Sequence, residues 1–226
     1  MLEFDSETLY PLLPLDSHTY AEAQAHSECV DHYLGLNTAQ IERQILLKLK
    51  GKGNSEYPQQ LWIGYPTQGI LTPYSEIRQI LAQISPHPGA TIVDLGAAYG
   101  RMGFVIGEHY PEVNFVGYEF VEERVTEGSK IMLARNLNNS KLLQADLTEP
   151  NFKPIEADFY FIFDYGTRKA IEKTLQDLRE TARSKKTTVV ARGRACRDAI
   201  DQTHPWLSTM VKPEHFMRYS IYRSQN

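Results

Sequence analysis

From residue 90 onward, two kinds of hydrophobic pattern alternate along the chain. Short apolar runs bounded by glycine, proline or polar residues predict buried strands at 90–95, 114–119, 140–145, 158–163 and 187–192. Between them, apolar residues recur every three or four positions, which predicts helices at 100–110, 122–136 and 168–183. Strands that alternate with helices in this order form a mostly parallel, doubly wound α/β sheet.

Another helix is predicted directly before the first strand. Thr72 can cap its start, and Pro73 fits the first turn, where its missing N–H does no harm. Pro86 and Pro88 end it. Its apolar face is formed by Ile77, Ile80, Leu81 and Ile84. The preceding residues, 57–71, mix aromatic residues with prolines and glycines, which predicts an ordered loop.

The N-terminal part of the chain predicts two further helices. Ser17 can cap the first and Gly35 can end it, and Asn37 followed by Gln40 is typical of a second helix start. The glycine- and lysine-rich residues 50–54 then break the pattern. The inward positions are Tyr20, Ala23, Ser27, Val30 and Leu34 in the first helix and Ile41, Ile45, Leu46 and Leu49 in the second. These helices cover the core, form a dimer surface or bind substrate, and the sequence does not decide between these roles.

Composition narrows the class of protein. The 226 residues suffice for one ample core, and a net charge of -4 with mixed signs favours neither nucleic acid nor an anionic membrane as a partner. The acidic start and the absence of a long apolar run predict a cytoplasmic protein without a membrane segment. Cys29 and Cys196 are too few for a disulfide framework, and the histidines are scattered. We therefore expect reduced thiols and no metal.

The loop after the first predicted strand carries the strongest chemical signal. The strand ends at Asp94, the small residues Gly96, Ala97 and Gly100 follow, and a helix begins. A second strand ends at Glu119, and this pairing predicts an adenosine ligand. The glycine spacing differs from the G-x-G-x-x-G of dinucleotide sites, and an acid before the loop would repel a pyrophosphate but attract an ammonium group. S-adenosylmethionine carries such an ammonium group and a ribose with two free hydroxyls.

On these residues the chain resembles the class I, seven-stranded S-adenosylmethionine-dependent methyltransferases. The run D-L-G-x-x-x-G-R at 94–101 is similar to the first motif of that family, and Glu119 stands where its ribose-binding acid stands. Together with Thr72-Pro73-Tyr74 and Gly117-Tyr118-Glu119, the order is similar to the branch with Dot1-like and mitochondrial protein lysine methyltransferases. The resemblance covers residues 68–192. It implies that 206–211 and 214–223 complete the sheet as a hairpin, after a short helix at 195–203.

Three residues are candidates for the adenosine contacts beside Glu119. The resemblance places adenine near Asp146, which could accept a hydrogen bond from the amino group, while Leu147 packs on the ring. Phe120 could stack on adenine. Each also has a plain structural interpretation, because acids often follow strands and Phe120 could be an ordinary core residue. For Glu119, that interpretation is a solvated acid at a strand end.

Asp164 and Tyr165 are the candidates on the acceptor side, since they end the fourth strand, which lies beside the methyl group in this architecture. Asp164 could orient an incoming amine or cap the following helix, and Tyr165 could line the pocket. The resemblance places Tyr74 over the methionine end of the cofactor, although it could be ordinary helix packing. Arg101 could pair with the cofactor carboxylate or be a solvated residue of the first helical turn.

Basic residues are concentrated between 179 and 197, where seven bases accompany one acid. The first four are explained by a solvated helix end. The others, Arg192, Arg194 and Arg197, follow a strand, so they could also bind an anionic substrate or an acidic protein surface.

These patterns predict a helical cap over 1–56 and a class I methyltransferase domain over 57–226. We expect methyl transfer from S-adenosylmethionine to an amine, such as a protein lysine. The alternatives are a small-molecule methyltransferase and a binding module without turnover. We do not expect a nucleic-acid partner, and the oligomeric state is not predicted.

Overall fold

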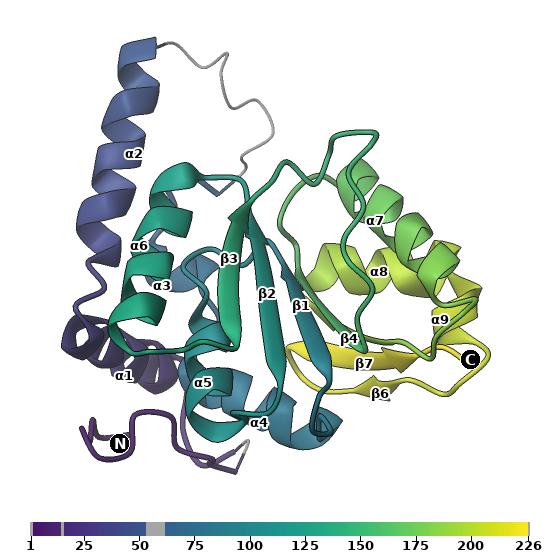
Figure 1. The fold of residues 1–226 in the computed structure, drawn as a ribbon, viewed down its shortest axis with the longest axis horizontal. Helices are drawn as coiled ribbons and strands as arrows, with labels where there is room; N and C mark the ends of the chain where they lie inside the picture. Colours follow the sequence, from purple (N-terminus) through teal and green to yellow (C-terminus); the bar gives the residue numbers. More distant parts are fainter. Residues whose placement is uncertain (1, 15, 53–61, 226) are drawn as a thin grey trace.

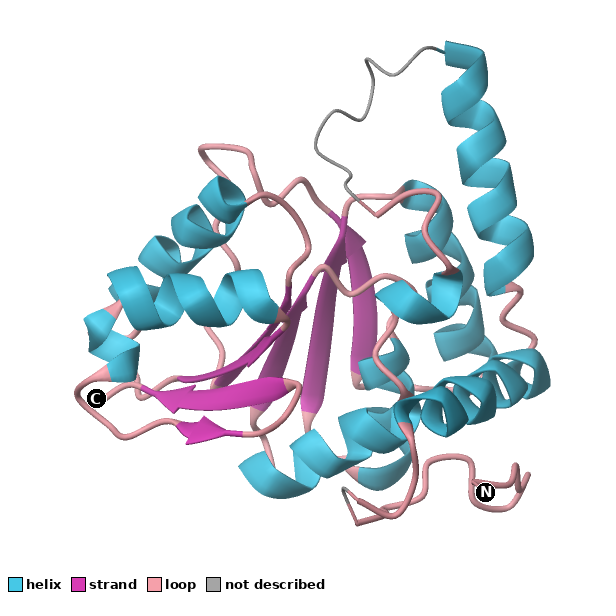
Figure 2. Ribbon diagram, turned by 180° about the vertical axis from the view of Figure 1, so that it is seen from behind, coloured by secondary structure: helices cyan, strands magenta, loops and turns pink. Residues whose placement is uncertain are grey.

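A computed structural model describes residues 2–14, 16–52 and 62–225 of the chain. Over these residues, seven strands form one twisted sheet with helices on both faces (Figures 1 and 2). The strands are β1 (Thr91–Leu95), β2 (Asn114–Glu119), β3 (Ser140–Gln144), β4 (Phe159–Phe163), β5 (Thr188–Arg192), β6 (Glu214–His215) and β7 (Tyr219–Arg223). The predicted doubly wound α/β class is confirmed, and the five predicted parallel strands lie within one residue of their expected bounds.

The strand order is β3-β2-β1-β4-β5-β7-β6, in which β1 to β5 are parallel and β7 is antiparallel to both neighbours. The chain moves outward from β1 to β3 and then returns to the other side of β1 for β4. The connections after β1 and β4 therefore diverge, and open α/β sheets bind their ligands outside the strand ends at such a point.

Each face of the sheet has its own apolar core. One face is covered by α4 (Tyr74–Ile84), α5 (Arg101–His109) and α6 (Glu122–Ala134), and the other by α7 (Arg168–Thr181), α8 (Arg194–Thr203) and α9 (Pro205–Ser208). The predicted stripes lie inside, because Ile80 and Leu81 of α4 and Ile171 and Leu175 of α7 have no exposed surface. The periodicity thus identified both the helices and their buried sides.

The N-terminal helices lie on the side of α5 and α6. They are α1 (Tyr20–Leu34), α2 (Thr38–Lys52), which stands beside α6, and the short α3 (Thr67–Ile70) (Figure 1). Thr19 caps α1 in a reciprocal box with Glu22, two residues after the predicted cap, and Gly35 ends it in the left-handed region at φ 77° as predicted. Helix α2 continues to Lys52, past the start of the predicted break at 50–54.

The sequence did not predict α3, which lies within the expected loop of 57–71. Residues 53–54 of the predicted break and 57–61 of that loop lie outside the described residues. Over the described part of the chain, no helix is long and apolar enough to cross a membrane.

The C-terminal hairpin differs from the prediction. Residues 206–211, expected to pair with the last strand, begin within helix α9, and β7 pairs instead with β6. Pro205 explains the difference, because its fixed φ suits the first turn of a helix. The short helix before it, predicted at 195–203, is confirmed as α8.

Candidate cofactor and acceptor site

The glycine loop follows β1 at the sheet's switch point, where the connections after β1 and β4 diverge. Gly96 has φ 91° and Gly100 has φ 77°, a backbone region that favours glycine. The N–H groups of Gly96 and Ala97 both donate to the carbonyl of Tyr118 at 2.9 Å, so the loop is attached to the end of β2. Gly100 precedes the first residue of α5. The structure therefore brings the predicted loop and the second strand end together.

Asp94 is the least satisfied acid at this edge. Its side chain is buried, and no described residue donates a hydrogen bond to its carboxylate. Burial, together with the charge of Glu119, raises the pKa of Asp94 to about 8. A buried carboxylate without a donor is costly to ionise, so a cation at this position would be bound strongly.

Asp94 faces a small cavity of about 30 Å³. Its walls include Gly96, Ala97 and Arg101 from the predicted site, Ile70, Leu71 and Thr72 from the segment before α4, and Phe161 and Phe163 from β4. This volume is about the space that one water molecule takes in the liquid. The space left beside the glycine loop is therefore small, and the segment Ile70–Thr72 lies against the loop.

Tyr165 also packs against the glycine loop. A side chain at Gly96 would overlap Tyr165, so glycine is required for this close approach. The Tyr165 hydroxyl lies 3.1 Å from the Ala170 carbonyl and 2.6 Å from the Thr174 hydroxyl, both in α7. Tyr165 thus connects the loop after β1 to the helix after β4.

Glu119 is buried and holds the strand ends together. Its carboxylate accepts the N–H of Ala98 at 2.9 Å and the N–H of Val121 at 2.9 Å. The guanidinium of Arg124 lies 3.5 Å from the same group. The structure thus replaces the solvated acid considered above with a buried one. A carboxylate has more acceptor sites than these contacts use, so ribose hydroxyls remain compatible with it.

The three candidates for adenine contacts lie near Glu119 at the same edge. Phe120 directly follows β2 and is half-buried. The carboxylate of Asp146 accepts hydrogen bonds from the N–H and the hydroxyl of Thr148 at 2.8 and 2.7 Å, which is a turn that aspartate commonly forms. Leu147 is buried in the core with Tyr118. None of the three is among the residues that line the cavity at Asp94.

Asp164 caps a helix, but a different one from the helix considered in the sequence analysis. Its two carboxylate oxygens accept the N–H groups of Ala195 and Cys196 at 3.1 and 2.8 Å, at the start of α8. Thr167 caps the following helix, α7. Asp164 also has an unusual φ of 25°, and its carbonyl accepts a hydrogen bond from the indole N–H of Trp62 at 2.7 Å. The turn that follows β4 is thus held both by the start of α8 and by Trp62.

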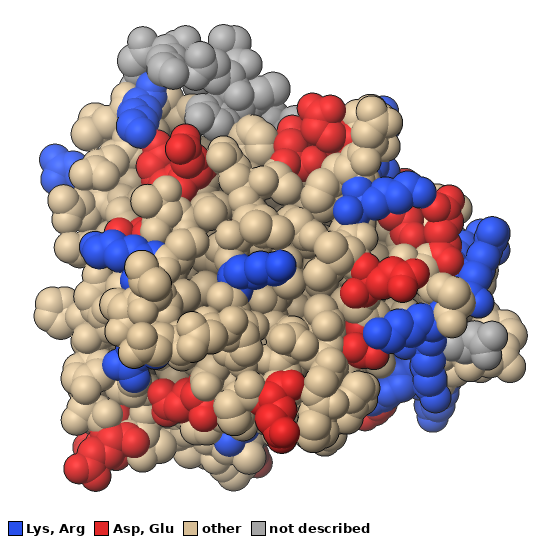
Figure 3. All heavy atoms as spheres, in the orientation of Figure 1, with Lys and Arg blue, Asp and Glu red and all other residues tan. Residues whose placement is uncertain are grey.

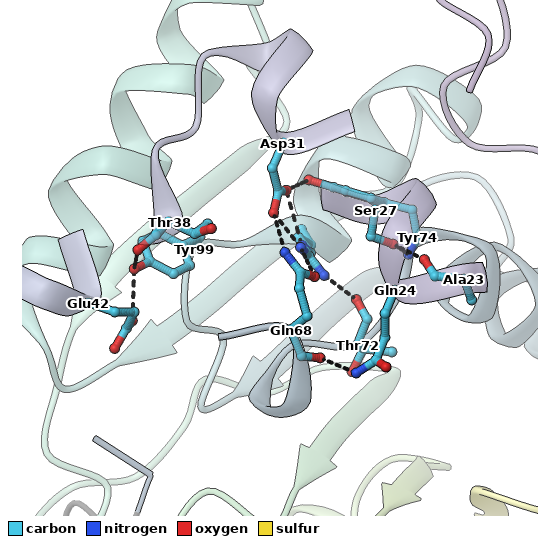
Figure 4. A network of polar contacts seen from close by, with 11 residues as sticks. Ala23, Gln24, Ser27, Asp31, Thr38, Glu42, Gln68, Thr72, Tyr74 and Tyr99 are labelled. Atoms are coloured by element: carbon cyan, nitrogen blue, oxygen red, sulfur yellow. Dashed lines mark hydrogen bonds and ion pairs between the residues drawn. The ribbon is translucent and has the colours of Figure 1, made fainter. Parts of the chain in front are cut away.

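Arg101 is buried rather than solvated, and it binds the N-terminal helices. Its partners Asp31, Gln68 and Thr72 are labelled in Figure 4. Its guanidinium pairs with Asp31 of α1 and donates to the Thr72 carbonyl at 3.2 Å and to the Gln68 side chain at 2.8 Å. It lies over the ring of Tyr74, 4.8 Å from the centroid. The Tyr74 hydroxyl donates to Asp31 at 2.9 Å, so Tyr74 has the packing role that the sequence left open.

Two other buried arginines show the same arrangement. Arg124 of α6 pairs with Glu42 of α2 at 2.8 Å, and Arg192 at the end of β5 pairs with Glu76 of α4 at 2.6 Å. Arg192 also donates to the hydroxyl of Tyr20 in α1 at 2.9 Å. These contacts attach both long N-terminal helices to the sheet domain.

The basic segment does not form one anion site. Arg192 is paired and buried, Arg197 donates to the backbone carbonyls of Gly193 and Phe216, and Arg194 is exposed with Asp198 3.6 Å away. Basic and acidic side chains are interspersed over the face seen in Figure 3. The suggested anionic substrate therefore gains no support from these three arginines.

Sequence analysis missed Asp31, Glu42 and Gln68. The two acids carried a usable signal, because Asp31 lies at helical spacing between Ser27 and Leu34, and Glu42 lies beside the inward Ile41. A charged residue on an apolar helix face requires a buried partner. No comparable signal marks Gln68, which lies in the short helix α3.

No protein-family model and no curated protein matches this sequence. Solved structures match its fold. The precorrin-6y C5,15-methyltransferase from Geobacter metallireducens is 12% identical with a TM-score of 0.53, over 70% of this chain and 90% of that one. The RNA methyltransferase from Salinibacter ruber, in complex with S-adenosyl-L-homocysteine, is 19% identical with a TM-score of 0.51, over 69% and 92%.

Other structures are matched over about half of their length. TrmN from Thermus thermophilus is 18% identical with a TM-score of 0.50, over 69% of this chain and 49% of that one. The chain likewise spans 50% of the YcgJ protein from Bacillus subtilis, with a TM-score of 0.39. The chain therefore has the class I methyltransferase fold. One neighbour is an RNA methyltransferase, so the comparisons do not support the expectation that excludes nucleic acid.

Proposed function

We propose that the protein transfers a methyl group from S-adenosylmethionine to an amine. The observation that carries this proposal is the Asp94 carboxylate, which is buried at the switch point of a methyltransferase-type sheet and lacks a donor among the described residues. An ammonium group would provide both the charge and the hydrogen bonds that this carboxylate lacks. Pyrophosphate-bearing ligands would be repelled by the same group.

The other residues at this edge fit the rest of such a cofactor. In this proposal Glu119 accepts hydrogen bonds from the ribose hydroxyls, and Gly96, Ala97 and Gly100 allow the backbone to approach the ligand. Phe120, Asp146 and Leu147 form the adenine side. The bound sulfonium supplies the activated methyl group, and the protein supplies alignment and a dry pocket.

Binding requires more space than the structure leaves beside the glycine loop. A cavity of about 30 Å³ is far below the roughly 300–1,000 Å³ of pockets for larger ligands. We propose that Ile70–Thr72 and Tyr165 move away from the glycine loop when the cofactor enters. In the open state Tyr165 would line the acceptor side, as its place after β4 suggests.

We propose a positioning role for Asp164. Its carboxylate caps α8 and its carbonyl is held by Trp62, so it fixes the turn that carries Tyr165. A residue in a strained backbone conformation at a strand end is typical of functional sites. In this proposal the amine itself meets Tyr165 rather than the carboxylate.

A protein lysine is our first choice of acceptor. Its support is the similarity of Thr72-Pro73-Tyr74 and D-L-G-x-x-x-G-R to protein lysine methyltransferases. In this view residues 1–56 form a cap on the domain of residues 57–226. An enclosed pocket would favour a metabolite and an open channel a protein side chain, but the cavity at Asp94 is too small to hold either.

Calorimetry tests the cofactor assignment. Because the pKa of Asp94 is raised to about 8, the group is largely protonated at pH 7 and must lose its proton when it binds an ammonium group. S-adenosylmethionine should therefore release close to one proton at pH 7, measurable by titration in buffers of different ionisation enthalpy. Its affinity should rise between about pH 6 and 8.

The matched control is Asp94→Asn, which keeps the size of the side chain. This variant should release no proton and should bind S-adenosylmethionine about 10–100-fold more weakly. Equal affinity in the variant, or tighter binding of NAD than of S-adenosylmethionine, would refute the proposal.

A labelling experiment tests turnover and the acceptor. The protein is incubated with methyl-labelled S-adenosylmethionine and a cell extract of the source organism, with Asp94→Asn in parallel. Label in protein, lost in the variant, supports the lysine proposal. Label in small molecules or nucleic acid assigns a different acceptor, and binding without label in any fraction identifies a binding module.

A further inference from the structure

A second cavity lies between the end of α1 and the helices α5 and α6, apart from the glycine loop. Its volume is about 210 Å³, several times the roughly 30 Å³ of a water molecule in the liquid. It shares no lining residue with the cavity at Asp94. The residues that line it indicate what it could hold.

The inner wall of this cavity is apolar. Phe104 and Ile131 are buried, and Leu34 and Leu137 pack against the same core. Gly107 also lines it, in the interior of α5, where glycine is less favourable than alanine by about 1 kcal/mol. A side chain at Gly107 would overlap Leu137. The inner wall thus suits an aliphatic group.

Two opposite charges stand at the mouth. Arg135 of the α6 end and Glu108 of α5 both line the cavity, and their nearest atoms, Nη2 and Oε2, are 3.9 Å apart. This distance is too long for a hydrogen bond. Their side chains are 40% and 35% exposed, and no other carboxylate among the described residues pairs with Arg135. Glu108 also lies 3.7 Å from the His109 ring, and both the guanidinium and the carboxylate keep exposed surface for another partner.

We propose that this cavity binds a small aliphatic α-amino acid. Its side chain fills the apolar part, its carboxylate binds Arg135 and its ammonium group binds Glu108. A zwitterion satisfies both charges at once, whereas a ligand with one charge would leave the other group without a new partner. The volume is below that of typical sites for nucleotides and other large ligands, which is why the proposal concerns a small molecule.

L-Leucine is the probe, tested with the whole chain by ligand-observed NMR and calorimetry. Its comparators are 4-methylpentanoate, which lacks the amino group, and 3-methylbutylamine, which lacks the carboxylate. Leucine should bind with a Kd on the order of 1 mM or lower, and each comparator at least about tenfold more weakly.

The variants Arg135→Gln and Glu108→Gln remove the two charges at partly exposed positions. Each should weaken leucine binding about tenfold or more. Lys130→Gln, which removes an exposed charge from the same helix α6, and Asp94→Asn, at the other cavity, should leave it unchanged. Circular dichroism confirms that each variant is folded.

Three results would overturn the proposal. Leucine does not bind at about 10 mM; the three probes bind equally, which would indicate a plain apolar cavity; or leucine binding responds to Asp94→Asn and not to Arg135→Gln. None of these results depends on methyl transfer, because the assay measures leucine binding alone.

Discussion

Two groups of buried acids in this protein differ in their partners. Three acids on the helices around the sheet each meet a buried arginine, in the pairs Asp31–Arg101, Glu42–Arg124 and Glu76–Arg192. Asp94, at the end of β1, meets no donor among the described residues. Both groups are equally hidden from solvent, so burial alone does not separate structure from function. The partner does, because an internally paired charge is already compensated within the fold, whereas Asp94, with its raised pKa, is mostly protonated near neutral pH and has no internal partner for its ionised form.

The largest effect is expected where a pair is broken. Asp31→Ala leaves the buried guanidinium of Arg101 without its carboxylate, and the free energy of unfolding should fall by about 3–5 kcal/mol in urea denaturation. Glu172→Ala breaks the exposed pair with Arg168 and should cost less than about 1 kcal/mol.

If Asp31→Ala does not fold, the double variant Asp31→Leu with Arg101→Met provides the measurement. Apolar residues of similar volume can replace a buried pair at little cost, so it should recover part of the loss, while the buried Tyr74 hydroxyl still lacks its acceptor. Equal, small losses at Asp31 and Glu172 would contradict the structural role of the pair.

Substitution of Asp94 should have the opposite effect and increase the free energy of unfolding. Its folded-state pKa of about 8 lies above the ordinary value of 3.8. The folded protein therefore holds the Asp94 proton more tightly than the unfolded chain does. The free energy of unfolding should fall as pH rises from about 4 to 8. Asp94→Asn lacks this loss and should be more stable than the wild type by up to about 5 kcal/mol at pH 8, and by about 2 kcal/mol at pH 5. Urea denaturation at the two pH values checks this, and a wild type that gains stability relative to the variant between pH 5 and 8 would exclude an unpaired Asp94.

Glu119 is the intermediate case, because it has both internal partners and a proposed ligand. Glu119→Ala removes the acceptor for two backbone N–H groups and should reduce stability by about 2 kcal/mol. It should also weaken S-adenosylmethionine binding by about 1.5–2 kcal/mol, or roughly tenfold to thirtyfold. Stability and cofactor affinity should thus both fall in Glu119→Ala. In Asp94→Asn, by contrast, stability should rise while cofactor affinity falls.

Glu122→Ala is the matched control for Glu119→Ala. Glu122 is an exposed acid in the first turn of α6, so its loss should cost about 0.5 kcal/mol of stability and leave cofactor affinity unchanged. Loss of stability without loss of affinity in Glu119→Ala would restrict Glu119 to the fold.

The sequence was informative where the cause of structure is local. The periods of 2 and 3.6 identified β2 at its observed bounds, and the glycine loop after Asp94 identified the edge of the sheet that holds the cavity. The difference at 206–211 has a local cause too, since Pro205 starts helix α9.

What the sequence could not predict depends on contacts between distant residues. Arg101 meets Asp31, 70 positions earlier in the chain, so its environment could not be derived from its own helix. The sequence allows Asp164 to cap the next helix, but in the structure it caps α8, because β5 pairs with β4 and so places the start of α8 beside it. Local signals therefore predicted which edge carries the site, and tertiary contacts decided which of its charges are already used.

The smallest effect is expected at Asp164, whose carboxylate is satisfied as fully as those of the paired acids. Asp164→Asn keeps a residue that tolerates positive φ but loses one of the two acceptors at the start of α8, so stability should fall by about 1 kcal/mol. Thr167→Ala, which removes the cap of α7, should cost a similar amount.

If Asp164 only positions the turn after β4, turnover and S-adenosylmethionine affinity should both change less than about threefold in each variant. A loss of turnover beyond about 100-fold in Asp164→Asn alone, with cofactor affinity intact, would show that the carboxylate acts on the acceptor, and an acid with internal partners would then belong to the reaction as well as to the fold.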